Sequence, residues 1–316
     1  MSFGVDAPGG AWLYPIQGRR AVHMAGHAES RWITVDGRRT HVVDAGRGPP
    51  LLFLHGFLHS SWTWRAALEA LSGSHRVIAP CLPGFGWSDA EAGDVSLPAL
   101  VRWLEALLDE LRVPRLAGAI GNSLGGGLCL ALAHQAPQRV ERLVLVSALG
   151  AWLPVPSLPL RLLGVRALGP LYGATAGRAA FVRRLLQLTT YRRCAVDDEV
   201  LRGFAHLSRP GGHAAAVAHA SALGASSREL VRLVPAVRTP SLVVWGAEDR
   251  LLPLGYGRKV AARLPDARLE VLPGCGHCAQ EEEPERFLQR LRAFLPATAS
   301  AGGAPPAGPP ELIAAR

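Results

Sequence analysis

The chain has 316 residues, of which 49% are hydrophobic, so a sizeable core can form and wholesale disorder is excluded. It contains no apolar run of about eighteen residues, which argues against a membrane-spanning helix. The chain has five cysteines, and this odd, small number argues against a fold held together by disulfide bonds. A cytoplasmic location is the default expectation, because the twin-arginine-like pair Arg19-Arg20 is followed by a segment that His23 and His27 interrupt.

Most of the net charge of +9 comes from one segment, since residues 151–238 hold twelve arginines and four acidic residues. This segment has few aromatic side chains to stack on bases, so nucleic-acid binding is not expected. The whole chain has one lysine, a bias that indicates genomic base composition rather than selection for a ligand. We expect a solvated arginine face, with attraction to an anionic substrate or weak contact with a membrane surface as the alternative.

Strand and helix patterns alternate along most of the chain. An Asp36-Gly37 pair between two β-rich runs predicts a hairpin. Strands are expected at 32–35, 40–43, 51–54, 76–79, the run leading to 122, 142–147, 241–246 and 269–272, and helices at 61–71, 97–111, 128–135, 256–264 and 279–295. This alternation predicts an α/β protein with a mostly parallel, eight-stranded sheet flanked by helices.

The alternation stops at residue 149 and resumes at 241. The intervening residues are rich in leucine and arginine, helical in tendency and broken by proline and glycine. We therefore predict a sheet core formed by 29–148 and 239–296, with a helical cap inserted at 149–238. Residues 1–28 are expected to form an irregular arm, and 297–316, rich in Ala, Gly and Pro, a disordered tail.

An apolar run ends abruptly at Gly121-x-Ser123-x-Gly125, which predicts a strand–turn–helix with the serine at its apex. Glycine suits both flanks because so tight a turn leaves no room for Cβ atoms. A serine needs a base to take its proton and an acid to orient that base. Asp249 and His277 each follow a predicted strand and could supply these groups.

Four motifs carry a family resemblance: HGF from His55, LPGFG from Leu82, GNSLGG from Gly121 and GHCAQEEEPERF from Gly276. In this order and between these strands, they resemble the α/β-hydrolase superfamily, its lid-bearing serine hydrolase branch in particular, from about residue 31 to 296. The resemblance implies the α/β-hydrolase fold with an inserted helical cap, and the chain order Ser, Asp, His agrees with it.

The resemblance also implies roles for these three residues. Ser123 would attack the substrate, His277 would accept and return the proton, and Asp249 would hold the imidazole. Glu248 is the alternative acid, adjacent to Asp249 but off the family pattern. No cofactor and no metal site are expected.

The backbone N–H groups of Leu124 and Phe57 would bind the oxyanion, since the resemblance places the second donor directly after the first His-Gly. His55 is expected to shape this loop rather than to react. The remaining histidines considered have no partner pattern and are expected to be packed or solvated: His59, His206, His213 and His219.

Two features depart from the family pattern. Cys81 stands where relatives usually carry Asp, so we expect the loop there to be stabilised differently in this chain. Cys275 and Cys278 flank His277 with the C-x-x-C spacing of thioredoxin-like redox pairs. Incidental cysteines are the expected explanation, and reversible oxidation that distorts the His277 loop is an alternative hypothesis.

The expected reaction is cofactor-free hydrolysis of a carboxylic ester of a hydrophobic small molecule, through an acyl-enzyme on Ser123. A carbon–carbon hydrolase of ring-cleavage products is one alternative, because such enzymes often share the GNS elbow. They usually carry Gly-Pro-Gly after the first His-Gly, where this chain continues Phe57-Leu58-His59-Ser60, and often Trp where it has Cys278, so the ester is favoured. A non-catalytic binder on the same fold is the other alternative.

Overall fold

The computed structural model describes residues 28–91, 93–150, 182–184, 186–187, 190, 196–204 and 211–296. Its sheet has eight strands in the order β1-β2-β4-β3-β5-β6-β7-β8. The strands are β1 (Ala28–Val35), β2 (Arg38–Ala45), β3 (Pro50–Leu54), β4 (Arg76–Pro80), β5 (Gly118–Asn122), β6 (Leu143–Val146), β7 (Ser241–Gly246) and β8 (Ala267–Leu272). Only β2 pairs antiparallel with its neighbours within this sheet, which confirms the predicted mostly parallel, eight-stranded arrangement.

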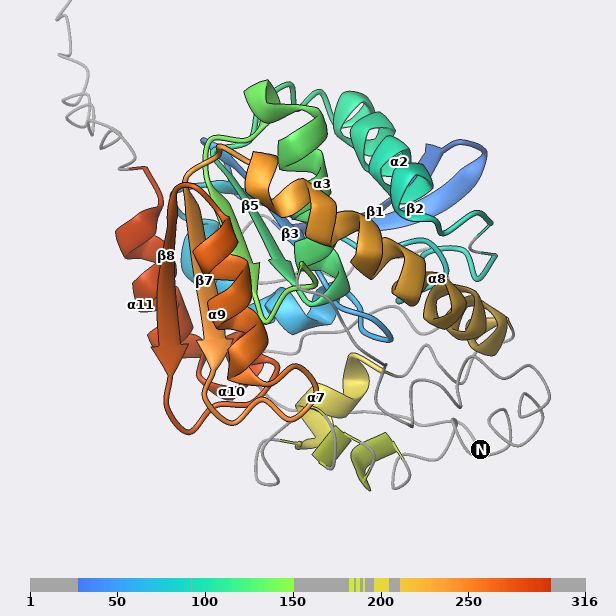
Figure 1. The fold of residues 1–316 in the computed structure, drawn as a ribbon. Helices are drawn as coiled ribbons and strands as arrows, with labels where there is room; N and C mark the ends of the chain where they lie inside the picture. The colour runs from blue at the N-terminus through green and yellow to red at the C-terminus, as the bar shows by residue number, and fades with distance from the viewer. Residues whose placement is uncertain are drawn as a thin grey trace, which may run out of the picture.

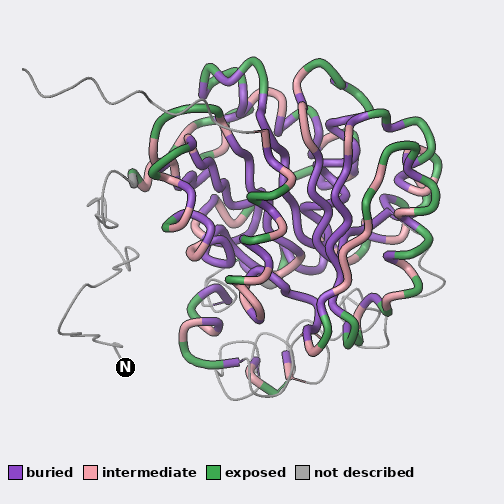
Figure 2. Tube along the Cα trace, turned by 90° about the vertical axis from the view of Figure 1, so that its left-hand side faces the viewer, coloured by how far each residue is buried: buried purple, intermediate pink, exposed green. Residues whose placement is uncertain are grey.

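Helices cover both faces of the sheet (Figure 1). The described helices are α1 (Arg65–Leu71), α2 (Leu97–Glu110), α3 (Leu124–Gln135), α7 (Asp198–Arg202), α8 (Gly212–Leu233), α9 (Leu254–Arg263), α10 (Ala279–Glu282) and α11 (Pro284–Phe294), with short 3-10 turns η1 (Ser61–Trp64), η2 (Pro137–Arg139) and η6 (Val234–Ala236). One apolar core packs α2, α3, α8 and α9 on the sheet, and a second packs α1 and α11 on the other face. The strands between these layers form the buried interior (Figure 2).

Two predicted helices differ in the structure. The segment expected as one helix over 61–71 begins as the 3-10 turn η1 before α1. The last helix, expected over 279–295, is divided into α10 and α11 at Glu283, whose φ is −140°. Pro284 explains the division, because a proline ring disfavours helical geometry in the residue before it. The division leaves α10 as a separate short helix directly after His277.

The helix after Ser123 is buried along nearly its whole length. Helix α3 lies between the sheet and helices α2 and α8, and its residues 124–133 are all buried. A Cβ atom at Gly126 would lie 2.4 Å from the Ala148 Cβ, and one at Gly127 would lie 2.7 Å from the Leu230 Cδ1. These glycines therefore permit the close packing of α3 on β6 and α8.

The segment between β6 and β7, expected to be a helical cap, is described only in part. Helix α8 packs on α3 and α2. A separate apolar cluster is formed by Val182, Leu186, Val196, Val200, Phe204 and Cys278. The expected arm at 1–28, apart from Ala28, and the expected tail at 297–316 lie outside the described residues. Among the described helices, none is long and apolar enough to cross a bilayer.

Candidate active site

Ser123 lies at the sharp turn between β5 and α3. Its backbone has φ 53° and ψ −115°, a combination that costs L residues free energy and is found mainly at functional sites. A Cβ at Gly121 would lie 2.4 Å from the Gly125 carbonyl carbon, and a Cβ at Gly125 would lie 2.3 Å from the Leu54 oxygen. Both flanking glycines are therefore required by contacts with backbone, which cannot move aside.

Asp249 and His277 form a buried pair. The distance from His277 Nδ1 to Asp249 Oδ2 is 2.8 Å. The other carboxylate oxygen, Oδ1, accepts the backbone N–H groups of Leu251 and Leu252 at 2.9 and 2.8 Å. Because an ionised carboxylate only accepts, the imidazole proton lies on Nδ1 and the lone pair on Nε2. Nε2 is buried and has no hydrogen-bond partner among the described residues.

Glu248, the alternative acid, is not part of this pair. Glu248 is exposed, and its backbone N–H donates to the Cys275 carbonyl oxygen at 2.9 Å. Asp249, in contrast, is only 5% exposed. The structure therefore brings Asp249, and not its neighbour, to the imidazole of His277.

Two residues that the sequence analysis did not single out hold the His277 loop. Glu282 accepts the N–H of Gly276 at 3.1 Å and that of Cys278 at 3.0 Å, on either side of the histidine. The amide of Asn122 donates to the His277 carbonyl oxygen at 3.1 Å. The motif GHCAQEEEPERF contains three consecutive acids, and its pattern gives no signal of which of them are turned inward.

His55 shapes the loop that follows β3. Its Nδ1 donates to the Gly56 carbonyl oxygen at 2.8 Å, and its Nε2 accepts the Leu82 N–H at 2.9 Å. Burial lowers the pKa of His55 to about 3, and the hydrogen bond to Gly56 opposes that shift. With both nitrogens engaged in a neutral ring, His55 links two loops and has no nitrogen left for proton transfer.

The loop carrying Phe57 lies against the elbow. A Cβ at Gly56 would lie 2.9 Å from the Asn122 Oδ1 and 3.2 Å from the Ser123 Cβ, so the close approach requires glycine. Within the described residues, the N–H groups of Phe57 and Leu124 donate to no backbone carbonyl. Of the two predicted oxyanion donors, Leu124 directly follows Ser123, and Phe57 directly follows the glycine that lies against it.

Two of the remaining histidines are packed. His219, on α8, stacks on Phe85 with ring centroids 4.4 Å apart, and its Nε2 donates to the Pro83 carbonyl oxygen at 2.9 Å. Burial lowers the pKa of His219 to about 4. His59 contacts Glu281. His206 and the side chain of His213 lie outside the described residues, so the expectation that they are packed or solvated stays a prediction.

The cysteine side chains have different surroundings. Cys275 packs in the core between the sheet and helices α1 and α11, whereas Cys278 packs in the separate cluster that includes Val200 of α7. Both are buried, an arrangement that does not favour a redox pair.

The Cys81 sulfur lies 3.4 Å from the Ser61 N and 3.7 Å from the His41 Nδ1, so donors surround the position where the family usually has Asp.

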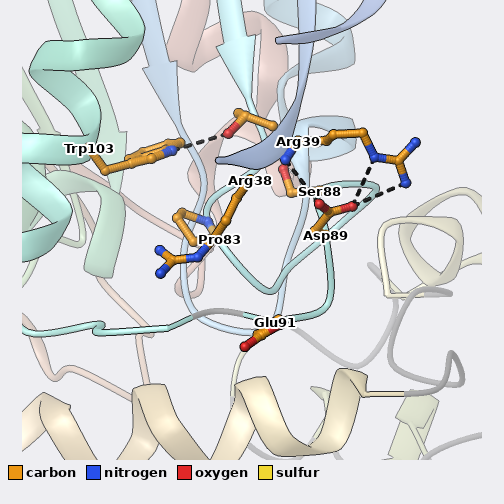
Figure 3. A pocket seen from close by; sticks show the side chains of 8 residues that line it. Arg38, Arg39, Pro83, Ser88, Asp89, Glu91 and Trp103 are labelled. Atoms are coloured by element: carbon orange, nitrogen blue, oxygen red, sulfur yellow. Dashed lines mark hydrogen bonds and ion pairs between the residues drawn. The ribbon is translucent and has the colours of Figure 1, made fainter. Parts of the chain in front are cut away.

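A small hollow lies elsewhere, between the start of β2 and the loop after β4 (Figure 3). Arg39 closes one side through two hydrogen bonds to Asp89, at 3.0 Å from its N and 3.2 Å from its Nε. Trp103 closes another side, where its Nε1 donates a hydrogen bond to the Thr40 hydroxyl at 3.1 Å. None of Ser123, Asp249 and His277 lines it. No group of three or more metal-ligating side chains occurs in the part of the chain that the structure describes.

Comparisons with known proteins identify the fold and the family of this chain. Residues 49–284 match the model of the alpha/beta hydrolase fold family. The chain is 34% identical over 278 residues to 2-hydroxymuconate semialdehyde hydrolase of Pseudomonas sp. (strain CF600), covering 84% of this chain and 93% of that protein. It is 36% identical over 279 residues to the protein of that name from Pseudomonas putida, with the same coverage.

Among solved structures, the meta-cleavage product hydrolase CumD of Pseudomonas fluorescens IP01 superimposes with a TM-score of 0.68 at 28% identity, covering 84% of this chain and 96% of that one. The resemblance inferred from the four motifs is therefore confirmed. The chain belongs to the alpha/beta hydrolase fold family.

Proposed function

We propose that this chain is a serine-dependent hydrolase that cleaves a carbon–carbon bond in a meta-ring-cleavage product. The observation that carries the proposal is the likeness, over 84% of the chain, to two enzymes named 2-hydroxymuconate semialdehyde hydrolase. This replaces the ester as first choice, because the ester was favoured on two sequence departures alone. The substrate would be a small conjugated keto acid with an apolar part.

In the proposed reaction, the Nε2 of His277 removes the proton from the Ser123 hydroxyl as the oxygen adds to the ketone carbon. The N–H groups of Phe57 and Leu124 bind the oxyanion that forms. The carbon–carbon bond then breaks, and its electron pair moves onto the conjugated acid fragment. His277 returns its proton to the carbon of that fragment from which the bond was broken. Water hydrolyses the acyl-serine in a second addition. Throughout, Asp249 keeps the imidazole in the required tautomer.

Ester hydrolysis remains the second candidate because of Phe57. Its ring packs edge-to-face on Phe85, with centroids 5.7 Å apart, where carbon–carbon hydrolases usually carry glycine. Cys278 stands where those enzymes often place Trp, and it is buried in the cluster that includes Val200 of α7. Both reactions use the same serine, base and oxyanion donors, so the substrate distinguishes them.

The test is kcat/KM on two substrates, since this ratio measures discrimination. We expect a 2-hydroxy-6-oxo-dienoate to be preferred over p-nitrophenyl acetate and butyrate by at least about tenfold. Preference for the esters would exchange the two candidates. Absence of turnover on both, with no labelling of Ser123 by an organophosphonate, would indicate a non-catalytic binder. Repeating the assay at rising salt would show whether the arginine-rich segment attracts an anionic substrate.

A further inference from the structure

A second buried carboxylate–imidazole pair lies beside the site. The distance from His59 Nε2 to Glu281 Oε2 is 2.9 Å, and the side chains are 3% and 1% exposed. The other oxygen of Glu281 accepts Arg65 Nη1 at 2.5 Å. His59 Nδ1 accepts the N–H of Ser60 at 2.8 Å, so the proton lies on Nε2. Unlike His277, His59 has both nitrogens engaged by these contacts, and it is not placed to act as a base.

This pair joins the two loops on which the proposed chemistry depends. His59 stands two residues after Phe57, a proposed oxyanion donor, and Glu281 stands four residues after His277, on α10. The two partners are 222 residues apart in the chain. Their hydrogen bond therefore fixes the distance between the oxyanion loop and the loop of the base.

The same loop also supports the segment inserted between β6 and β7. The hydroxyl of Ser60 donates to the Gly203 carbonyl oxygen at 2.9 Å, and Trp62 Nε1 donates to the Glu199 carbonyl oxygen at 2.7 Å. The ring centroids of Phe204 and His59 are 4.3 Å apart. A Cβ at Gly203 would lie 2.4 Å from the His59 Cε1. Helix α7 and the residues after it thus rest directly on this loop.

We propose that Glu281 and His59 are positioning residues, which hold the Phe57 N–H at the place where the oxyanion forms and seat α7 over it. The inference rests on the proposed serine hydrolase function. Glu281 is suited to this role because an ionised carboxylate can accept from both His59 and Arg65. A glutamine there would turn its NH₂ group toward one of these donors, so the loop would shift. Loss of a whole oxyanion donor costs about 10²–10³ in kcat, and displacement of one should cost about tenfold or more.

The experiment compares Glu281→Gln with Glu285→Gln, a matched change at an exposed position on α11. Active sites are first counted by organophosphonate labelling of Ser123, and kcat is then measured per labelled site with the better substrate. We expect Glu281→Gln to lower kcat per site about tenfold or more with KM changed less than about twofold, and Glu285→Gln to match the wild type. A merely structural role would lower the number of labelled sites and leave kcat per site unchanged, which would overturn the inference.

Two further variants complete the test. If Glu281→Gln gives no labelled sites, Arg65→Met decides instead, because Arg65 is partly exposed and its loss removes one of the two donors that hold the Glu281 carboxylate. It should lower kcat per site in the same direction by a smaller factor. An unchanged kcat per site in Arg65→Met would then overturn the inference. Ser60→Ala removes the bond to Gly203, and it should raise KM several-fold while kcat per site stays near the wild type; an unchanged KM would refute the seating of α7. A wild-type enzyme that does not label would refute the proposed function rather than this inference.

Discussion

The side-chain amide of Asn122 donates a hydrogen bond to the backbone carbonyl oxygen of His277, with Nδ2 and O 3.1 Å apart. The same amide donates to the Val146 carbonyl oxygen, also at 3.1 Å. The residue directly before Ser123 therefore holds the His277 loop, and it does so from the last position of strand β5. The turn at Ser123 and the His277 loop cannot shift independently while these two bonds persist.

Replacement of Asn122 by Ala should lower both stability and rate. The His277 carbonyl oxygen loses this donor, and the Val146 carbonyl oxygen keeps only the Ser123 N–H at 3.0 Å. The lost hydrogen bonds should cost about 1–3 kcal/mol of the free energy of unfolding. The rate should fall because the His277 loop is no longer held against the elbow. Urea unfolding and kcat per labelled site measure the two effects. Gln135→Ala, which removes an amide from the exposed end of α3, is the control and should change neither; an Asn122→Ala enzyme with the wild-type rate would show that Glu282 suffices.

Both Ser123→Ala and Ser123→Gly should abolish turnover and organophosphonate labelling, with losses of several powers of ten in rate. Their stabilities should differ. Glycine adopts φ 53° with little strain, whereas alanine retains the Cβ atom, so the glycine variant should unfold at equal or higher denaturant concentration. A strained non-glycine residue costs about 1–3 kcal/mol. Thermal and urea unfolding of the two variants decide the point, and retained turnover in either would remove Ser123 as nucleophile.

The pairing of His277 with Asp249 predicts unequal effects of two adjacent substitutions. Asp249→Asn should fold and lose about 10³–10⁴ in kcat, because an amide facing Nδ1 disfavours the tautomer that leaves Nε2 free. Glu248→Gln, at an exposed neighbour, should leave kcat within about twofold. Steady-state kinetics on both variants provide the comparison. The opposite ranking would assign the acid role to Glu248.

His219 predicts a loss of stability in acid. Its pKa is about 4 in the folded protein and 6.5 as a free side chain, so the unfolded chain binds a proton that the folded one does not. Stability from this group is complete above pH 6.5 and falls as the pH drops toward 4, by about 3 kcal/mol. His219→Gln, whose amide can still donate to the Pro83 oxygen, should reduce this decline in urea titrations between pH 7 and 4. His134→Gln, at an exposed position, is the control; equal pH slopes for wild type and His219→Gln would contradict the prediction.

The elements of the sheet could be predicted because their signals are local. Buried parallel strands are continuous apolar runs such as 51–54 and 241–246, and glycines mark a turn where backbone packs on backbone. The division of the last helix at Glu283 was available in principle from Pro284. It was missed because the apolar spacing continues through the proline, and amphipathic spacing reports burial rather than backbone continuity.

The sequence by itself determined the α/β fold, the elbow at Ser123 and the two further positions, Asp249 and His277, that follow strands. Only the tertiary structure decided which acid meets the imidazole, since Asp249 and Glu248 differ in orientation and not in chemistry. It alone revealed Asn122, Glu281 and Glu282 as the residues that hold the loops. The physical reason is that a hydrogen bond depends on distance and direction between two atoms, and His59 and Glu281, 222 residues apart, share no pattern along the chain that could predict their contact.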